Sequence, residues 1–203
     1  MARAHLRHRR DPLVRRTRHA GLADNQPARN PDPRRAQART CPPASATAAR
    51  AQLKGSPVPL ADLHGQASHL LGGESAFAAR IKALRGYPIV VNVWASWCTP
   101  CRDEFDLFAA ASAHYGRSVA FLGVDYNDST GNAEAFLRQH PVSYPSYQLT
   151  SGQLDSLLPA GIEGTPTTIY INPAGHVYSI HTGAYVSQGT LDGDIDSFAS
   201  PSR

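Results

Sequence analysis

Two cysteines stand three positions apart in the segment Cys98-Thr99-Pro100-Cys101, directly after the apolar run that contains Trp94 and Trp97. This spacing suits a structural disulfide, one half of a metal site, or a dithiol that exchanges electrons with other disulfides. A structural zinc site takes four ligands, and the only other cysteine is Cys41, far upstream. A disulfide across so short a loop restricts the unfolded chain very little. The pattern therefore favours a redox-active dithiol.

The position of this dithiol defines a role for each sulfur. An apolar run predicts a buried strand before Cys98, and a helical pattern begins at Pro100, a residue that the first turn of a helix accepts. At the start of a helix, unpaired N–H groups and the helix dipole stabilise an anion, so Cys98 is expected to form the attacking thiolate. Cys101, one turn further on, is expected to be the buried, resolving thiol.

Strand and helix patterns alternate around the dithiol and predict an α/β fold with a mixed sheet. Residues 55–66 are expected to be extended, and Phe77, Ile81 and Leu84 have the spacing of a helix that ends at Gly86. Strands are predicted at 88–94, 119–125 and 144–149, with a hairpin formed by 167–171 and 176–182. Helices are predicted at 100–115, 129–140, 153–160 and 187–199.

The charge is divided unevenly along the 203 residues. Residues 1–50 hold twelve Arg and three Asp, a net charge of +9, and the remainder carries −5. The first part is rich in Arg, Pro and Ala, so residues 1–54 are predicted to be a basic, disordered tail before a domain at 55–200. The tail contains no apolar segment typical of a secretion signal, and Cys41 is expected to be incidental. One hypothesis is that residues 1–45 come from a misassigned start or a frameshift.

Five segments together resemble the thioredoxin superfamily, and in particular its TlpA/ResA-like branch of extracytoplasmic thiol–disulfide oxidoreductases. They are "VVNVWASWCTPCRDEF", "VAFLGVD", "AEAFLRQHPVSYPS", "IEGTPTTIYINPAGHV" and "HTGAY", within residues 57–198. The resemblance implies a thioredoxin-like three-layer α/β/α sandwich with a mixed central sheet. It also implies that the Cys98–Cys101 pair is the redox centre and that no other cofactor is needed.

The resemblance also implies a proton acceptor for Cys101. Asn92 stands where cytoplasmic thioredoxins carry a buried aspartate, and this branch usually carries asparagine. Glu104 resembles the glutamate of ResA-like proteins and is the candidate proton relay, one helical turn from Cys101. The alternative for Glu104 is a solvated carboxylate that complements the helix dipole. Asp106 replaces a proline that commonly bends this helix in the family, so a straighter helix is expected.

Contacts with the substrate follow from the same resemblance. Thr165-Pro166 is similar to the superfamily's cis-proline, whose backbone pairs with an extended substrate segment beside the dithiol. Trp97 is expected to be a surface contact and Trp94 a core residue of the same site.

The expected function is reduction of disulfides in cysteine-containing exported proteins, with electrons from a membrane dithiol donor. Cytochrome c maturation and cell redox homeostasis are the processes that such domains commonly serve. We expect a monomer in the cell envelope, membrane-anchored in the manner of the family, with a cytoplasmic location as the alternative. No metal and no nucleic acid are expected.

Other functions stay open at this point. A DsbA-like oxidase would use the same site in the opposite direction. A peroxiredoxin-like peroxidase is disfavoured because Ala95 occupies the position, three before Cys98, where such enzymes need a hydroxyl. A non-catalytic binding module would leave the thiol of Cys98 inert.

Overall fold

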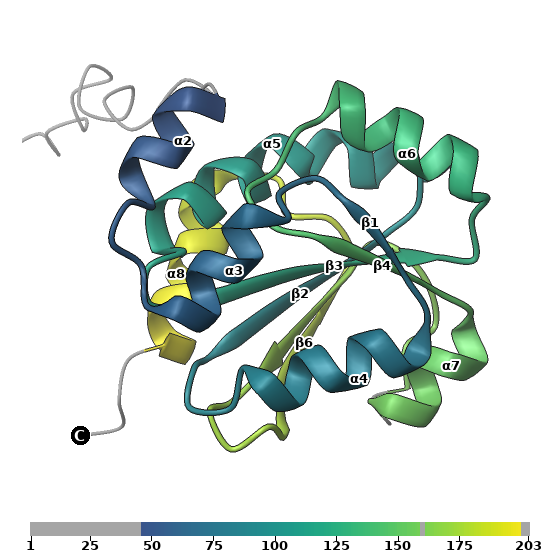
Figure 1. Cartoon of the computed structure of the whole chain (residues 1–203). Coiled ribbons are helices and arrows are strands. Elements are labelled where there is room, and N and C mark those ends of the chain that lie inside the picture. The colour runs from purple at the N-terminus through teal and green to yellow at the C-terminus, as the bar shows by residue number, and fades with distance from the viewer. Residues whose placement is uncertain (1–45, 159–160, 200–203) are drawn as a thin grey trace, which may run out of the picture. The chain divides into compact units, whose positions relative to one another are not determined.

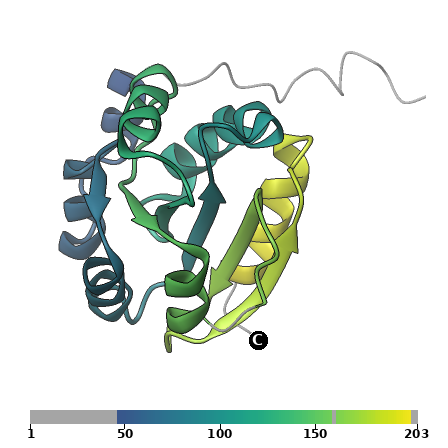
Figure 2. The same cartoon turned by 90° about the vertical axis from the view of Figure 1, so that its right-hand side faces the viewer.

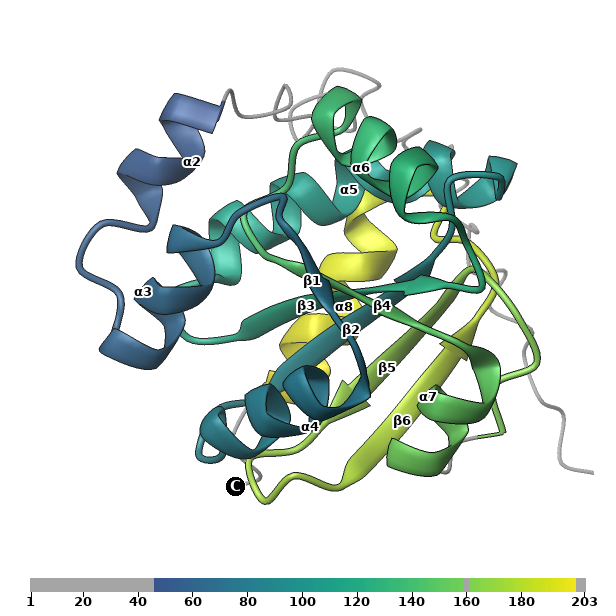
Figure 3. The same cartoon turned by 45° about the vertical axis from the view of Figure 1, so that its right-hand side comes forward.

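A mixed six-stranded sheet forms the centre of the computed structural model, which describes residues 46–158 and 161–199. Figure 1 shows this sheet between its helices. The strand order is β1-β4-β3-β2-β5-β6. The first four strands of this order are parallel, whereas β5 is antiparallel to both β2 and β6 (Figure 3). The strands are β1 (Leu70–Gly72), β2 (Ile89–Trp94), β3 (Ala120–Tyr126), β4 (Ser146–Leu149), β5 (Thr167–Ile171) and β6 (Val177–Thr182).

Helices cover both faces of this sheet (Figure 2). Apolar side chains of α5, α6 and α8 pack on one face, and those of α3, α4 and α7 pack on the other. The helices are α2 (Ala46–Gln52), α3 (Val58–Gly65), α4 (Glu74–Ala83), α5 (Thr99–Tyr115), α6 (Thr130–Gln139), α7 (Ser151–Leu157) and α8 (Gln188–Ala199). The arrangement confirms the predicted three-layer α/β fold.

The alternation of side chains along β2 divides the core into two clusters. Val90 and Trp94 point toward α5, whereas Ile89, Val91 and Val93 point toward the opposite face. Because both faces are covered, the strand is a nearly continuous apolar run, and all six of its residues are buried.

An aromatic cluster fixes α5 and α6 on the strand that leads to the dithiol. Phe105 of α5 meets the Trp94 ring edge-on at a centroid distance of 5.3 Å and the Phe136 ring at 4.8 Å. The rings of Trp94 and Phe136 lie 5.0 Å apart. Such ring pairs contribute about 0.5–1.5 kcal/mol each beyond their buried area, so the strand and both helices are held as one rigid support.

Three segments near the N-terminal side differ from the sequence-based expectation. Residues 55–66 contain α3, because Pro57 and Pro59 lie at the helix cap and first turn, where a missing N–H has no cost. The strand β1 was not predicted, since its three residues are too few to show a period.

The third difference concerns the predicted disordered tail. Its last residues, 46–54, include α2, which contacts α5. Leu53, directly after this helix, is buried. The alanines of "ATAARAQ" have the highest helix propensity of all residue types, and burial of Leu53 adds the packing that a short helix needs. The expectation for residues 1–45 lies outside the described residues.

One end of the sheet gathers segments that are far apart in the sequence. The parallel strands β2 and β3 both end there, with Trp94 opposite Asp125. The antiparallel strand β5 begins there, and Thr167 pairs with Thr182 at the end of β6. The connections that follow β2, β3 and β6 and precede β5 therefore meet at this end, which is where the dithiol lies.

Candidate active site

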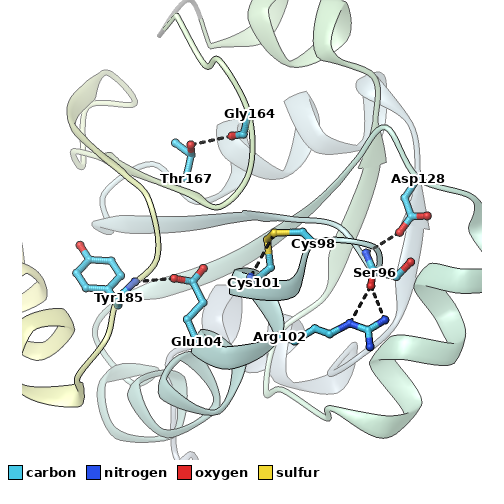
Figure 4. The surroundings of a disulfide bond; sticks show 9 residues. All are labelled: Ser96, Cys98, Cys101, Arg102, Glu104, Asp128, Gly164, Thr167 and Tyr185. Carbon is cyan, nitrogen blue, oxygen red and sulfur yellow. Dashed lines mark hydrogen bonds between the residues drawn. A yellow bond between two sulfur atoms is a disulfide. The ribbon is translucent and has the colours of Figure 1, made fainter.

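Cys98 and Cys101 form a disulfide at the start of α5 (Figure 4). Cys98 is the N-cap residue, and its sulfur accepts a hydrogen bond of 3.2 Å from the main-chain N–H of Cys101. Pro100 occupies the first turn, as the sequence predicted. Cys98 is 4% exposed and Cys101 is fully buried, so both residues belong to the buried core and only Cys98 keeps any contact with solvent.

The helix start makes the environment of Cys98 electropositive. The N–H groups of the first turn have no acceptor within the helix, and the dipole of α5 adds partial positive charge. After reduction of the disulfide, the N–H of Cys101 that points at the Cys98 sulfur would stabilise a thiolate there. The geometry therefore suits a nucleophilic sulfur at Cys98.

Glu104 is wholly buried one turn after Cys101, which is not the solvated position considered as an alternative. Its Oε2 accepts a 2.8 Å hydrogen bond from the main-chain N–H of Tyr185 (Figure 4). Its Oε1 has no hydrogen-bond partner among the described residues. Burial raises the pKa of Glu104 to about 7, and the Tyr185 N–H acts in the opposite direction. A carboxyl with such a pKa can gain or lose a proton at neutral pH.

Two further buried polar side chains, those of Asn92 and Tyr144, lie close to each other in this part of the protein. Asn92 is buried on β2, on the same face as Trp94, and lies near the hydroxyl of Tyr144. Burial raises the pKa of Tyr144, and the negative charge of Glu104 raises it further. Asn92 itself carries no charge, so it cannot serve as a proton acceptor in the way that a buried carboxylate can.

A set of hydrogen bonds among Arg102, Ser96 and Asp128, on the other side of the disulfide, was not predicted. Arg102 donates from Nε and Nη2 to the carbonyl oxygen of Ser96, at 2.9 and 2.6 Å. The N–H of Ser96 in turn donates to Oδ2 of Asp128 at 2.7 Å (Figure 4). The guanidinium also lies 5.7 Å from the centre of the Phe136 ring. These contacts hold the segment that precedes Trp97 and Cys98.

Asp125, at the end of β3, is a second buried carboxyl at this end of the sheet. Burial is the main reason that its pKa is raised to about 7, and the nearby charge of Asp128 adds to the shift. A hydrogen bond of 3.0 Å from Gln148 acts in the opposite direction. An aspartate at the end of a predicted buried strand, with a second one three positions later, is a signal that could have pointed to Asp125 and Asp128 from the sequence.

The remaining predicted residues meet at the same end of the sheet. The Thr165–Pro166 peptide bond is cis, the isomer that the resemblance implies, and the Pro166 carbonyl accepts from the N–H of Gly183 at 3.0 Å. Trp97 is 59% exposed, whereas Trp94 is buried and its indole N–H donates to Ser146. The connection that contains the cis bond leads directly into β5, whose Thr167 pairs with Val93 of β2.

Neither a metal-binding cluster nor a membrane-spanning helix occurs among the described residues. Within residues 46–158 and 161–199, no three His, Cys, Asp or Glu side chains gather in a way that would hold a metal ion. None of the helices in the same ranges combines the length and apolar character that crossing a bilayer requires.

Comparisons with known proteins agree with this geometry. Thiol-disulfide oxidoreductase ResA of Bacillus subtilis is 31% identical over 102 residues, which cover 49% of this chain and 55% of ResA. Thiol:disulfide interchange protein DsbE of Pasteurella multocida is 29% identical over 131 residues, 64% of this chain and 67% of DsbE. The crystal structure of a putative DsbE from Chlorobium tepidum aligns with a TM-score of 0.54 and 28% identity, over 59% of this chain and 85% of that one.

The match to these proteins is partial in length. The chain spans 55–65% of the length of three ResA proteins that it matches. Over that span, the names of the relatives confirm the resemblance to ResA-like thiol–disulfide oxidoreductases. Residues 43–180 match the AhpC/TSA family, which is more than half of the chain. The chain therefore belongs to the AhpC/TSA family.

Proposed function

We propose that this chain is a thiol–disulfide oxidoreductase that reduces protein disulfides through Cys98 and Cys101. The observation that carries the proposal is the pair of cysteines at the start of α5, Cys98 with a small exposed fraction and Cys101 fully buried, together with the buried carboxyl of Glu104 one turn further on. The relatives named as thiol–disulfide oxidoreductases or interchange proteins support the same chemistry.

The reduced dithiol would act in two displacement steps. The Cys98 thiolate attacks one sulfur of the substrate disulfide, forms a mixed disulfide and expels the first substrate thiolate. Cys101 then loses its proton and attacks the Cys98 sulfur, which breaks the mixed disulfide and expels the second substrate thiolate. Two electrons pass to the substrate, both substrate sulfurs take up protons, and the chain is left with the Cys98–Cys101 disulfide.

Glu104 supplies a proton acceptor for the second step. Cys101 is fully buried, so its proton has no direct route to solvent, and Glu104 follows it by one turn of α5. With a pKa of about 7, the carboxylate is a base matched to neutral pH. It takes the proton of Cys101 and, as the protonated acid, passes it to a departing thiolate.

The substrate would bind as an extended segment across the end of the sheet. Trp97 offers an exposed ring beside Cys98, and the backbone around Thr165 and Pro166 offers hydrogen-bonding groups at the start of β5. These contacts would involve the backbone and a sulfur of the substrate and no particular side chain. They therefore suit cysteine-containing proteins in general. We propose further that the chain acts outside the cytoplasm on exported proteins, with a membrane dithiol as the electron donor. The resemblance to the extracytoplasmic ResA-like branch supports this location.

The direction of electron flow is tested by the reduction potential of the Cys98/Cys101 couple in the full-length chain. Equilibration in glutathione or dithiothreitol buffers, followed by alkylation and mass spectrometry, measures it. A potential of about −270 mV or lower fits a reductase, and a value near −120 mV would identify an oxidase and overturn the proposed direction.

The chemistry itself is tested with cysteine variants and a disulfide-bridged peptide. Cys101→Ala should accumulate the mixed disulfide, Cys98→Ala should form none, and Cys41→Ala, the matched control, should behave as the wild type. Equal reactivity of Cys98→Ala and the wild type would exclude the dithiol mechanism. Rapid consumption of hydrogen peroxide with no reduction of the peptide would favour a peroxidase, and an unreactive Cys98 would indicate a binding module.

A further inference from the structure

Tyr185 connects the buried carboxyl of Glu104 with two other elements of the fold. It lies between β6 and α8, and its main-chain N–H donates to Glu104 on α5 at 2.8 Å. Its hydroxyl donates to Oδ2 of Asp194 on α8 at 2.6 Å and lies 2.7 Å from the hydroxyl of Tyr170 on β5. One residue thus joins the Glu104 carboxyl, through its backbone, to β5 and α8, through its side chain.

The side chain of Tyr185 anchors a connection that is otherwise exposed or only partly buried. Between Thr182 and Thr190, Tyr185 alone is buried, and its neighbour Val186 is 92% exposed. The Tyr185 ring stacks on His181 with a centroid distance of 4.0 Å and meets Phe108 of α5 edge-on at 6.1 Å. The position of its backbone N–H therefore depends on where the ring and hydroxyl are held.

That N–H is the single hydrogen-bond donor to the Glu104 carboxyl among the described residues. A hydrogen bond to a carboxylate favours the ionised form, and here it opposes the desolvation that favours the protonated form. If the N–H moved away, Glu104 would keep its own proton at neutral pH. It would then no longer accept the proton of Cys101.

We infer that Tyr185 is a positioning residue of the dithiol site, whose hydroxyl, held by Tyr170 and Asp194, keeps the main-chain N–H on Glu104 so that this carboxylate accepts the proton of Cys101. The inference rests on the proposed function, in which Glu104 is the proton acceptor. The effect of Tyr185 on the dithiol passes through Glu104, to which its main-chain N–H donates.

Several other titratable groups lie near Glu104 and Tyr185, and their titration must be distinguished from that of Glu104. Tyr144 precedes β4, and Tyr170 lies on β5; the charge of Glu104 raises the pKa of both. On the outer side, His181 of β6 lies 3.8 Å from Asp194 of α8. The hydroxyls of Tyr144 and Tyr170 remain protonated through neutral pH, because burial raises their pKa values further above the ordinary value of about 10.

The decisive variant is Tyr185→Phe, which removes the hydroxyl and keeps the ring. The titration of the Glu104 carboxyl is followed by carbon NMR in the oxidised protein, in which neither cysteine titrates. The pH profile of peptide reduction is measured in single turnovers of the reduced protein. We expect the Glu104 titration to move to higher pH. A shift of one pH unit corresponds to ~1.4 kcal/mol, near the low end for a hydrogen bond to a charged group. Because the pKa of Glu104 is about 7, such a shift lowers its ionised fraction at pH 7, and with it the rate, about fivefold.

Two further variants keep the test decisive. Tyr178→Phe removes a hydroxyl from a 62% exposed tyrosine on β6 and should change neither measurement. Asp194→Ala removes the hydroxyl's acceptor at a half-exposed site of α8 and should act in the same direction as Tyr185→Phe, more weakly. If Tyr185→Phe does not fold, Asp194→Ala decides, and an unchanged Glu104 titration in that variant overturns the inference.

Glu104→Gln separates failure of this inference from failure of the proposed function. If Glu104→Gln leaves the pH profile as in the wild type, Glu104 is not the proton acceptor and the proposed relay is wrong. If Glu104→Gln alters the profile while Tyr185→Phe leaves both the profile and the carboxyl titration unchanged, the relay stands and the positioning role of Tyr185 is wrong.

Discussion

The buried carboxyl of Glu104 should make the oxidised protein less stable as the pH rises from acid to neutral. In the folded chain its pKa is raised from 4.5 to about 7, and burial is the main cause. Between these two values the folded state holds a proton that the unfolded state has released. The free energy of unfolding therefore falls by about 1.4 kcal/mol per pH unit, or about 3 kcal/mol in total.

Glu104→Gln removes this dependence and keeps the shape of the side chain. The amide oxygen can still accept the N–H of Tyr185, and a neutral group has no desolvated charge at high pH. We expect the variant to be about 3 kcal/mol more stable than the wild type at pH 8, relative to their difference at pH 4.5. The contribution of Asp125 is present in both proteins and cancels in this comparison.

Urea unfolding of the oxidised proteins from pH 4.5 to 8.5, followed by the fluorescence of the buried Trp94, measures the effect. Asp106→Asn is the matched control, because it removes an exposed carboxylate from the same helix and should leave the pH dependence as it is. A stability difference between Glu104→Gln and the wild type that stays constant with pH would refute the reasoning. A difference that changes in the opposite sense would also refute it.

Three further variants test the burial and packing around the site. Asp125→Asn should remove a second loss of stability between about pH 4 and 7, because the pKa of that buried carboxyl is also raised to about 7; urea unfolding against pH checks it. Phe105→Ala should lower the free energy of unfolding by about 3–5 kcal/mol through loss of the central ring of the aromatic cluster, measured by urea titration at one pH. Gly123→Ala should cost about 1–3 kcal/mol in thermal unfolding, since a Cβ there would overlap Oγ of Ser146. Gly131→Ala is its control, because a Cβ on that exposed helical glycine meets nothing within 4 Å, so it should not destabilise.

The sequence predicted the local elements around the dithiol well, for a physical reason that lies within each element. The buried strand before Cys98 and the helix after it follow from an apolar run and from apolar residues at helical spacing. Cys98 lies at the helix cap because the strand and the helix follow each other closely in the sequence. The roles of Thr165-Pro166, Trp97 and Glu104 came from resemblance and stay proposals.

The sequence-based predictions failed in two segments where one local signal concealed another. The prolines of residues 55–66 indicated an extended chain, but their positions at the start of α3 suit a helix. The basic composition of the tail concealed the alanine-rich α2, whose neighbour Leu53 gains burial only in the folded chain.

The sequence by itself determined where the two sulfurs lie, which strand and helix carry them, and that a carboxyl follows Cys101 by one turn. Only the tertiary structure decided that Glu104 is buried and that, among the described residues, its carboxyl accepts a hydrogen bond from Tyr185 alone, 81 positions away in the chain. The same holds for the hydrogen bonds that Ser96 makes with Arg102 and Asp128. These contacts depend on strand order, which brings the ends of β2, β3 and β6 and the start of β5 together, and the periodicity of a single segment contains no information about that order.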